Sequence, residues 1–246
     1  MRSPGIVLAS AGLLALAAST LGGLIAGPAS APVPTKVYGE WHIRIKPDRG
    51  AEYAQLIQEK GLPLFKEAGG RMVGWWTTMV GDLYEHVTIW EYDSMTAFEK
   101  AGSILSKDDR FRQFVVKRDP LLNGEDNRFE RLVNFSRIPT LPETAKVVVH
   151  EVHHVSLAGR EIYLQQVEEA LKLAEKHGFR IVGPWQTTLG DISEYTCLWL
   201  YDSLADRDMK LEALAASEDH QRLLHLLYGS CQGSVSRVLS PASFAR

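Results

Sequence analysis

The sequence has few cysteines and no excess of charge of either sign. Its 246 residues include two cysteines, Cys197 and Cys231, too few for the disulfide framework that small secreted domains use. The 27 Lys and Arg against 30 Asp and Glu leave a net charge of −3, so the basic surface typical of a nucleic-acid binder is missing. With 45% hydrophobic residues, the chain can bury one or two ordinary globular cores.

The longest uncharged stretch lies at the N-terminus and includes the apolar run from Ile6 to Ala26, after Arg2. A positive residue, an apolar region and then small residues up to Ala31 form the order found in secretory signal peptides. We therefore expect an exported protein, periplasmic or secreted, cleaved after Ala29 or Ala31. The alternative is an uncleaved anchor within residues 1–31, because about 20 apolar residues can just span a bilayer. Contact with a membrane is expected through this segment alone.

One segment of the chain occurs twice. Residues 74–94 (GWWTTMVGDLYEHVTIWEYDS) return 109 positions later as residues 183–203 (GPWQTTLGDISEYTCLWLYDS), with ten of 21 positions identical and no gap. A repeat of this length corresponds to a whole domain rather than to a solenoid unit, so the chain is a tandem duplication. We place the first domain at residues 37–136, a linker at 137–145 and the second domain at 146–240.

Each repeat has the pattern strand, helix, strand, strand, helix, strand. In the first, alternation predicts a strand over residues 37–45, then a helix interrupted at Gly61 and Pro63, and a hairpin of residues 71–79 and 84–92. Two tandem βαββαβ units predict two ferredoxin-like domains of class α+β, each with both helices on one face of a four-stranded sheet. The bare sheet faces must be covered, so we expect the sheets to pack face to face as an α+β barrel.

The second repeat resembles a known family. Residues 197–207 (CLWLYDSLADR), with residues 213–217 and 221–224 after them, are similar to the third strand and following helix of the NIPSNAP domain. In the first repeat, residues 86–92 (HVTIWEY) form a related core with two additional residues between His and Trp. The resemblance covers nearly all of residues 37–240. It implies a dimeric α+β barrel, a fold shared with small monooxygenases, haem-degrading enzymes and lactone isomerases, and it implies no settled chemistry.

Strand alternation distributes side chains between the helices and the barrel interior. On the first strand Trp41 and Ile43 suit the helices, which directs Glu40, His42 and Arg44 inward. We expect His86 to point inward from the third strand. Glu40, His42 and His86 are therefore the candidate catalytic residues, since a carboxylate beside an imidazole raises its pKa, fixes its tautomer and allows general-base chemistry. The simpler alternative is that these polar groups only satisfy one another.

The expected ligand pocket lies between the sheets and is lined by inward residues of both repeats. The candidates are Arg44, Thr88, Trp90, Tyr92, Glu151, His153, Tyr195, Trp199 and Tyr201. Such a mixture of charged and aromatic side chains is typical of small-molecule sites, although the aromatic ones can also serve only to fill the core. Tyr195 and Cys197 stand where the first repeat has His86 and Thr88, so we expect any site to be asymmetric and to belong to the first repeat.

Residues 150–154 (HEVHH) match the pattern of zinc proteases, but their alternating context predicts a strand. Residues four apart on a strand lie about 13 Å from each other, too far for two imidazoles to bind one zinc ion. We therefore expect no metal and no cofactor. Haem would need an inward axial histidine such as His42, His86 or His153, and no spacing in the sequence demands one.

The sequence leaves three functions open. We expect an exported barrel protein that binds a small apolar or aromatic ligand between its sheets, without assigned catalysis. The alternative is a barrel enzyme, a cofactor-free or haem-dependent monooxygenase or an isomerase, that uses the inward Glu and His residues. The third is a structural or interaction module. The barrel can close within one chain as a monomeric pseudo-dimer, or between two chains as a homodimer.

Overall fold

The computed structural model describes residues 36–137 and 145–244. The predicted leader and most of the predicted linker lie outside these ranges, as do the last two residues. Within the described ranges, no helix has the length and apolar character needed to cross a membrane.

The first repeat follows the expected order of elements, with its second helix divided in two. The elements are β1 (Val37–Ile45), α1 (Gly50–Leu56), a π-helical turn (Ile57–Gly61), α2 (Leu62–Glu67), β2 (Arg71–Val80), β3 (Glu85–Tyr92), α3 (Met95–Lys107), α4 (Asp109–Arg118), a 3-10 turn (Asp119–Leu121) and β4 (Leu122–Arg137). The predicted interruption lies at the π-helical turn, because Pro63 has no N–H to continue the regular hydrogen-bond pattern. α3 and α4 are separate helices because Asp108 is extended and its side chain caps α4 at the N–H of Arg110.

The second repeat has the same order. Its elements are β5 (Val147–His154), a 3-10 turn (Leu157–Gly159), α5 (Arg160–Lys176), β6 (Arg180–Leu189), β7 (Glu194–Tyr201), α6 (Leu204–Ala215), α7 (Asp219–Tyr228) and β8 (Gly233–Pro241).

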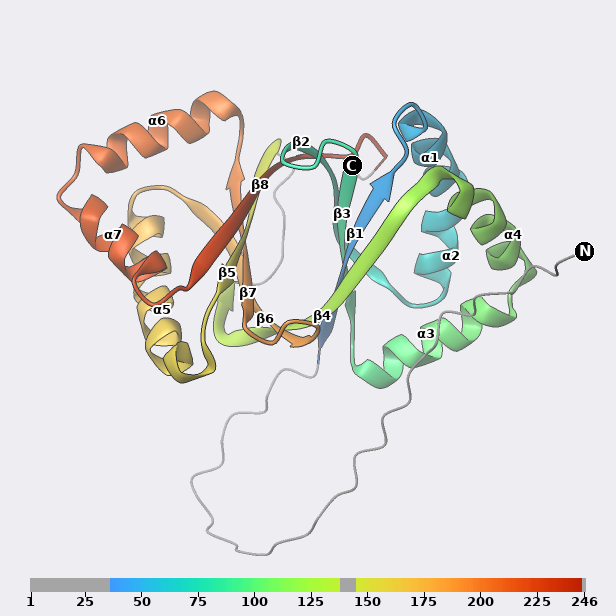
Figure 1. The fold of residues 1–246 in the computed structure, drawn as a ribbon, viewed down its shortest axis with the longest axis horizontal. Helices are drawn as coiled ribbons and strands as arrows, with labels where there is room; N and C mark the ends of the chain where they lie inside the picture. The colour runs from blue at the N-terminus through green and yellow to red at the C-terminus, as the bar shows by residue number, and fades with distance from the viewer. Residues whose placement is uncertain (1–35, 138–144, 245–246) are drawn as a thin grey trace, which may run out of the picture. The chain divides into compact units, whose positions relative to one another are not determined.

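The eight strands close into one barrel in the order β1-β3-β2-β8-β5-β7-β6-β4. Each repeat contributes four neighbouring antiparallel strands in the ferredoxin-like order, and the two sheets join at their edges through β2–β8 and β4–β6. Helices α1–α4 cover one side of the barrel and α5–α7 the other (Figure 1). The predicted α+β barrel is therefore confirmed, and it closes within a single chain.

Apolar side chains pack in three clusters, one under each helix layer and one inside the barrel. The interior cluster includes Tyr38, Trp76, Val148, Trp185 and Leu198, and the rings of Tyr38 and Trp185 meet edge to face at 5.8 Å. This packing fills the middle of the barrel, whereas a cavity at one end of the barrel is lined by Arg44, one of the predicted pocket residues. A ligand pocket between the sheets therefore stays a prediction.

The facing predicted for the third strand is also wrong. Residues directly opposite in an antiparallel pair share a face, and Glu40 pairs with Ile89 while Trp41 pairs with Thr88. Val87 and Ile89 therefore point into the barrel with Glu40. The candidate residues His86, Thr88, Trp90 and Tyr92 point to the helices instead. The error arose because every residue of β3 is buried, so neither face of the strand is marked by exposure.

The second repeat shows the same reversal. Glu151 pairs with Cys197 and His153 with Tyr195, and these residues face the helices. Tyr195, Trp199 and Tyr201 belong to the cluster under α5–α7. The inward residues of β5 are instead Val148, His150 and Val152. On β1 the predicted facing is correct, with Glu40, His42 and Arg44 on the barrel side.

Candidate functional site

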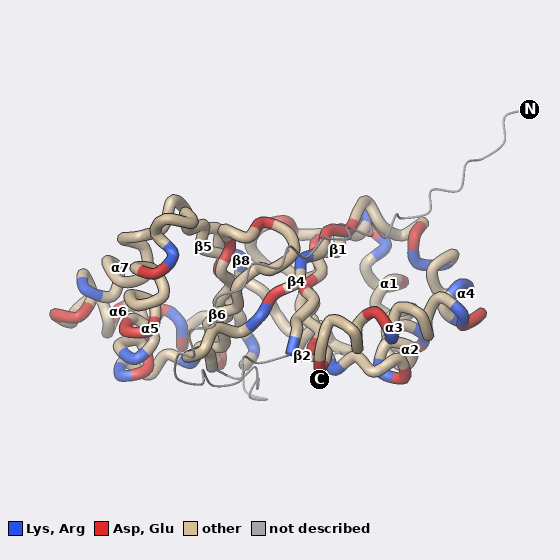
Figure 2. Tube along the Cα trace, turned by 90° about the horizontal axis from the view of Figure 1, so that it is seen from below, with Lys and Arg blue, Asp and Glu red and all other residues tan. Residues whose placement is uncertain are grey.

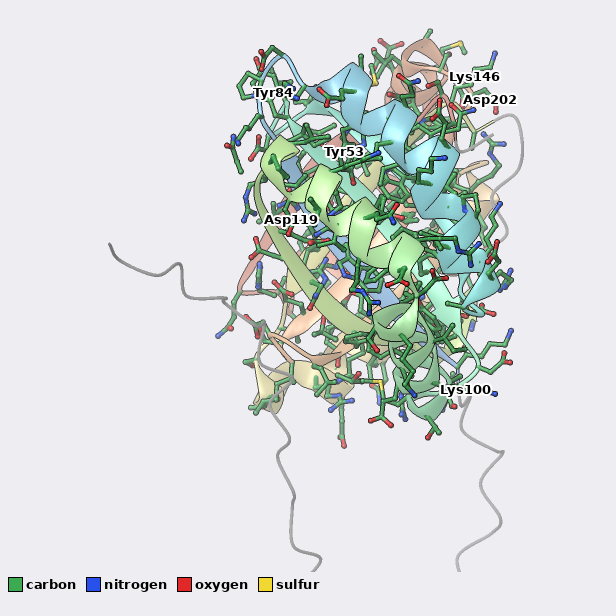
Figure 3. All side chains as sticks on the ribbon, turned by 90° about the vertical axis from the view of Figure 1, so that its right-hand side faces the viewer. Tyr53, Tyr84, Lys100, Asp119, Lys146 and Asp202 are labelled. Carbon is green, nitrogen blue, oxygen red and sulfur yellow. The ribbon has the colours of Figure 1, made fainter. Side chains whose placement is uncertain are left out.

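A cavity of about 290 Å³ lies between the sheet and the helices of the first repeat. Figure 3 views the molecule from this helix layer and labels Tyr53 of α1. Aromatic side chains from seven elements dominate the lining: Trp41, Tyr53, Phe65, Trp75, Trp90, Tyr92, Phe98 and Phe111. Three sequence candidates, Thr88, Trp90 and Tyr92, therefore line a cavity, on the opposite face of the sheet from the one expected.

The cavity has few polar groups. The hydroxyl of Tyr53 is fully buried and has no hydrogen-bond partner among the described residues. Thr88 donates its hydroxyl hydrogen to the carbonyl oxygen of Gly74 at 3.0 Å, which removes that donor from the cavity. Arg118 and Glu125, which also line the cavity, form an ion pair at 2.7 Å whose charges act on the Tyr53 hydroxyl. A largely apolar cavity lined by a residue with an unpaired hydroxyl is suited to an aromatic molecule that carries a polar group.

His86 lies behind this lining and contacts it through Tyr53 and Trp75. The indole N–H of Trp75 donates to Nδ1 of His86 at 3.1 Å, and the imidazole packs edge-on to the ring of Tyr53 at 5.4 Å between centroids. Burial lowers the pKa of His86 to about 4. The imidazole is therefore neutral at physiological pH, and because its Nδ1 accepts a hydrogen bond, its proton is on Nε2.

The equivalent region of the second repeat holds a polar network that ties its sheet to its helices. Glu151 accepts hydrogen bonds from Nε1 of Trp199 at 2.8 Å and from the hydroxyl of Tyr228 at 2.7 Å. Nδ1 of His153 lies 2.9 Å from the hydroxyl of Tyr163. Glu151 and His153 therefore connect β5 to the helices of the second repeat and do not lie between the two sheets.

The second polar site is inside the barrel, where Glu40 is the meeting point of three side chains. One of its oxygens, Oε1, accepts a hydrogen bond from Arg128 at 2.7 Å, lies 3.0 Å from Nε2 of His150, and contacts Nε2 of His42. Arg128 also pairs with Glu130 at 3.2 Å and with Glu194 at 2.6 Å. Charged residues of β1 and β4 are visible between the two helix layers in Figure 2.

Burial and mutual attraction compete in setting the pKa values of this cluster. Burial alone would raise the pKa of Glu40, but the positive charge of Arg128 and the hydrogen bonds from the two histidines hold it well below its usual range. Burial lowers the pKa of His42, yet hydrogen bonds to Glu40 and Glu85 raise it to about 9. Glu130 is fully buried beside the negative Glu40, and its pKa is raised to about 8. The cluster therefore retains protons at neutral pH that exposed groups of these types would lose.

One end of the barrel opens into a mouth of about 240 Å³, which we call the barrel mouth; its lining includes His42, Arg44, Glu85, Arg128 and Arg237. Arg44 pairs there with Asp126.

The structure separates the predicted catalytic set. Glu40 and His42 lie together inside the barrel, whereas His86 faces the helices on the other side of the sheet. Sequence reasoning missed Arg128, Glu130 and His150. For His150, the available signal was its alternation with Val148 and Val152, two apolar residues suited to the interior.

A model of the NIPSNAP family matches residues 42–137 and again residues 152–246, one match for each repeat. The chain belongs to the NIPSNAP family. The resemblance found in the sequence is therefore confirmed in both repeats.

Two solved structures resemble this NIPSNAP chain over most of its length. One is from Lactobacillus acidophilus NCFM, with 11% identity, a TM-score of 0.61, and coverage of 85% of this chain and 95% of its own. The other is from Fusobacterium nucleatum, with 10% identity, a TM-score of 0.61, and coverage of 85% and 93%. Both are named provisionally as monooxygenases. At this identity the likeness shows the fold alone.

A NIPSNAP family protein from Agrobacterium tumefaciens is 24% identical over 41% of this chain and 95% of its own, with a TM-score of 0.39. Among curated proteins, no sequence matches this chain.

Proposed function

We propose that this NIPSNAP protein binds a small, largely aromatic molecule in the cavity between the sheet and the helices of its first repeat. The observation that carries the proposal is an aromatic cavity of about 290 Å³ whose lining includes Tyr53, a residue with a buried hydroxyl that has no partner in the described chain. Burying a hydroxyl without a hydrogen bond costs about 1–3 kcal/mol, so a bound molecule that supplies the partner gains a specific contact.

The lining sets the chemistry of the ligand. Trp41, Trp90, Phe98 and Phe111 offer ring faces and edges, which favour a flat molecule of one to three aromatic rings. Tyr53 requires one oxygen or nitrogen on that molecule. The volume is at the lower limit of ordinary ligand pockets, so a long-chain lipid or a haem would not fit within it.

The binding proposal is tested with the uncharged fluorescent probe N-phenyl-1-naphthylamine, using energy transfer from the tryptophans of the cavity wall. Gly102 of α3 lines the cavity, and a Cβ atom added there meets no heavy atom within 4 Å. Gly102→Leu should therefore obstruct the cavity without strain, and it should improve the helix, since Gly is a poor helix former. We expect at least tenfold weaker binding of the probe.

Ser103→Leu is the matched control, because Ser103 is exposed on the same helix and is not part of the lining. It should leave the affinity unchanged. Equal affinities of the wild-type protein and Gly102→Leu would show that the probe binds elsewhere and would refute the proposal.

Oxygenation of such a ligand is a second candidate, and it is the activity in the names of the two fold neighbours. One observation favours it: a phenol donor in an apolar cavity is placed to stabilise negative charge that develops on a ligand oxygen. Oxygen consumption with anthrone tests it, because anthrone has fused rings and forms an oxyanion on deprotonation. If the protein speeds up oxygen consumption and Tyr53→Phe lowers that rate, catalysis is supported. If oxygen consumption is no faster with the protein than without it, the protein binds its ligand without oxygenating it.

We also propose that the protein is exported and acts as a monomeric pseudo-dimer. The N-terminal leader supports the first statement, and closure of the barrel within one chain supports the second. Mass spectrometry of the protein recovered from the producing cells reports whether residues up to 29 or 31 are removed. Light scattering in solution reports the mass: a value near 27.4 kDa or slightly below supports the monomer, and twice that value contradicts it.

A further inference from the structure

Three potential metal ligands converge inside the barrel: Glu40, His42 and His150. Their donor atoms all lie within 4.8 Å of one another, and all three residues are largely buried. Two of them come from β1 and the third from β5, so the group joins the first repeat to the second. Donor atoms at such separations lie close to where a single ion with bonds of about 2.0–2.2 Å needs them.

The surroundings of these residues resemble those of a metal ion rather than of a closed ionic core. Nδ1 of His42 lies 3.2 Å from Oε1 of Glu85, and a carboxylate behind the second nitrogen is the usual support for a metal-bound imidazole. Oε2 of Glu40 is buried and has no hydrogen-bond partner among the described residues. The barrel mouth reaches His42 from solvent and provides a route for an ion.

A metal ion would compete with a proton in this cluster. The cluster contains four carboxylates and two guanidinium groups: Glu40, Glu85, Glu130 and Glu194 against Arg128 and Arg237. The ion would take the place of the proton that His42 shares with Glu40 and Glu85, because a metal ion binds neutral imidazole. Arg128 shares Oε1 of Glu40 but does not compete for the second oxygen, which is free to bind an ion.

We propose that Glu40, His42 and His150 bind one divalent transition-metal ion, such as Zn²⁺ or Fe²⁺. Two imidazoles and one carboxylate suit these ions better than Mg²⁺ or Ca²⁺, which prefer oxygen ligands. Three protein ligands leave at least one coordination position for water or a ligand that enters through the barrel mouth. This metal site is separate from the cavity between the sheet and the helices of the first repeat. The proposal of a metal ion therefore does not depend on the ligand proposed for that cavity.

The proposed metal site assigns a ligand role to His150, the first residue of the HEVHH segment (residues 150–154). Its zinc-protease spacing is irrelevant, because β5 is a strand and His150 pairs with residues of the first repeat instead of with His154. Glu40 and His150 are each the fourth residue of the first strand of their repeat. The two repeats thus supply different ligands from the same position, and these ligands meet in the barrel.

The histidines of this segment provide matched variants for a test on the full chain. We expect isothermal titration and elemental analysis to show one Zn²⁺ bound per chain, with no displacement by excess Mg²⁺. His150→Asn should weaken binding by more than about 100-fold, beyond the 10–100-fold expected for the supporting Glu85→Gln. His153→Asn, a change at a buried residue on the other face of the same strand, should bind as the wild type does.

His154→Asn separates the proposal from the alternative group at the barrel mouth, His154 with Asp191 and Glu194. If His154→Asn abolishes binding and His150→Asn does not, the ion is at the mouth and the proposal is wrong. If His150→Asn does not fold, X-ray absorption of the zinc-loaded wild-type protein decides. Two imidazole ligands would support the interior site, since the mouth group offers one, and fewer than two, or no zinc bound at all, would overturn it.

Discussion

Replacing Tyr53 by Phe removes one oxygen atom from the wall of the proposed ligand cavity and changes nothing else in its shape. The side chain is fully buried, and its hydroxyl has no partner in the described chain. An unpaired buried hydroxyl lowers the stability of a protein by about 1–3 kcal/mol, and removing the hydroxyl by mutation recovers a part of this loss. We therefore expect the free energy of unfolding of Tyr53→Phe to be about 1 kcal/mol higher than that of the wild type. For a domain of this size, the Tm should be about 2–4 °C higher.

The same substitution should weaken only those ligands that use the hydroxyl. A lost hydrogen bond of about 1 kcal/mol corresponds to roughly fivefold weaker binding. 1-Naphthol should therefore lose about fivefold in affinity, while naphthalene, which has no polar atom, should bind with unchanged affinity. Competition against the fluorescent probe measures both.

Two results would refute this reasoning. A loss of stability above about 1 kcal/mol would show that the hydroxyl has a partner in the folded protein. An equal loss of affinity for naphthol and naphthalene would show that the hydroxyl does not contact the ligand.

Three further predictions concern stability. Glu151→Ala should destabilise the protein by about 3 kcal/mol in urea unfolding, because it leaves the buried indole N–H of Trp199 and the part-buried hydroxyl of Tyr228 without their acceptor; Glu151→Gln, which keeps one oxygen, should cost less. The pKa of His86 is lowered to about 4 in the folded protein from 6.5 in the unfolded chain, so between these pH values only the unfolded chain binds the proton. The protein should therefore lose about 3 kcal/mol of stability as the pH falls from 6.5 to 4. His86→Gln should remove that slope, and identical pH profiles for the two proteins would contradict the buried, neutral imidazole. Ser94→Ala should cost about 1 kcal/mol, because Ser94 caps α3 at the N–H of Ala97, and no change in the urea midpoint would contradict the cap.

The fold was predictable because several independent patterns agreed. The duplication, the alternation of β1, the turn at Gly81 and the helix interrupted near Pro63 each follow from local physics, and all appear in the structure. The break between α3 and α4 was missed. It depends on the side chain of Asp108, whose capping role competes with continuation of the helix.

The face of each central strand was not predictable from alternation alone. Polar residues on β3, such as His86, suggested a polar interior that would include Glu40. The pairing register decides the matter instead, because Glu40 lies opposite Ile89. A one-residue shift in register moves every side chain to the other face, so this register was needed to place His86.

The interior cluster depends on still longer-range information. His150 meets Glu40 across the barrel at 3.0 Å, although the two residues are 110 positions apart in sequence. Arg128 reaches the same carboxylate from β4. No local pattern in either repeat indicates such a contact, because it arises only when the two sheets close.

The proposed function requires that a small aromatic ligand binds between the sheet and the helices of the first repeat. A crystal of the protein soaked with 6-bromo-2-naphthol tests it most directly, because the bromine atom gives an anomalous signal that locates the ligand. We expect one strong peak within the cavity bounded by Trp41, Trp90 and Phe98, with the ligand oxygen within hydrogen-bond distance of Tyr53. A peak in the barrel mouth or under α5–α7, with none in that cavity, would contradict it.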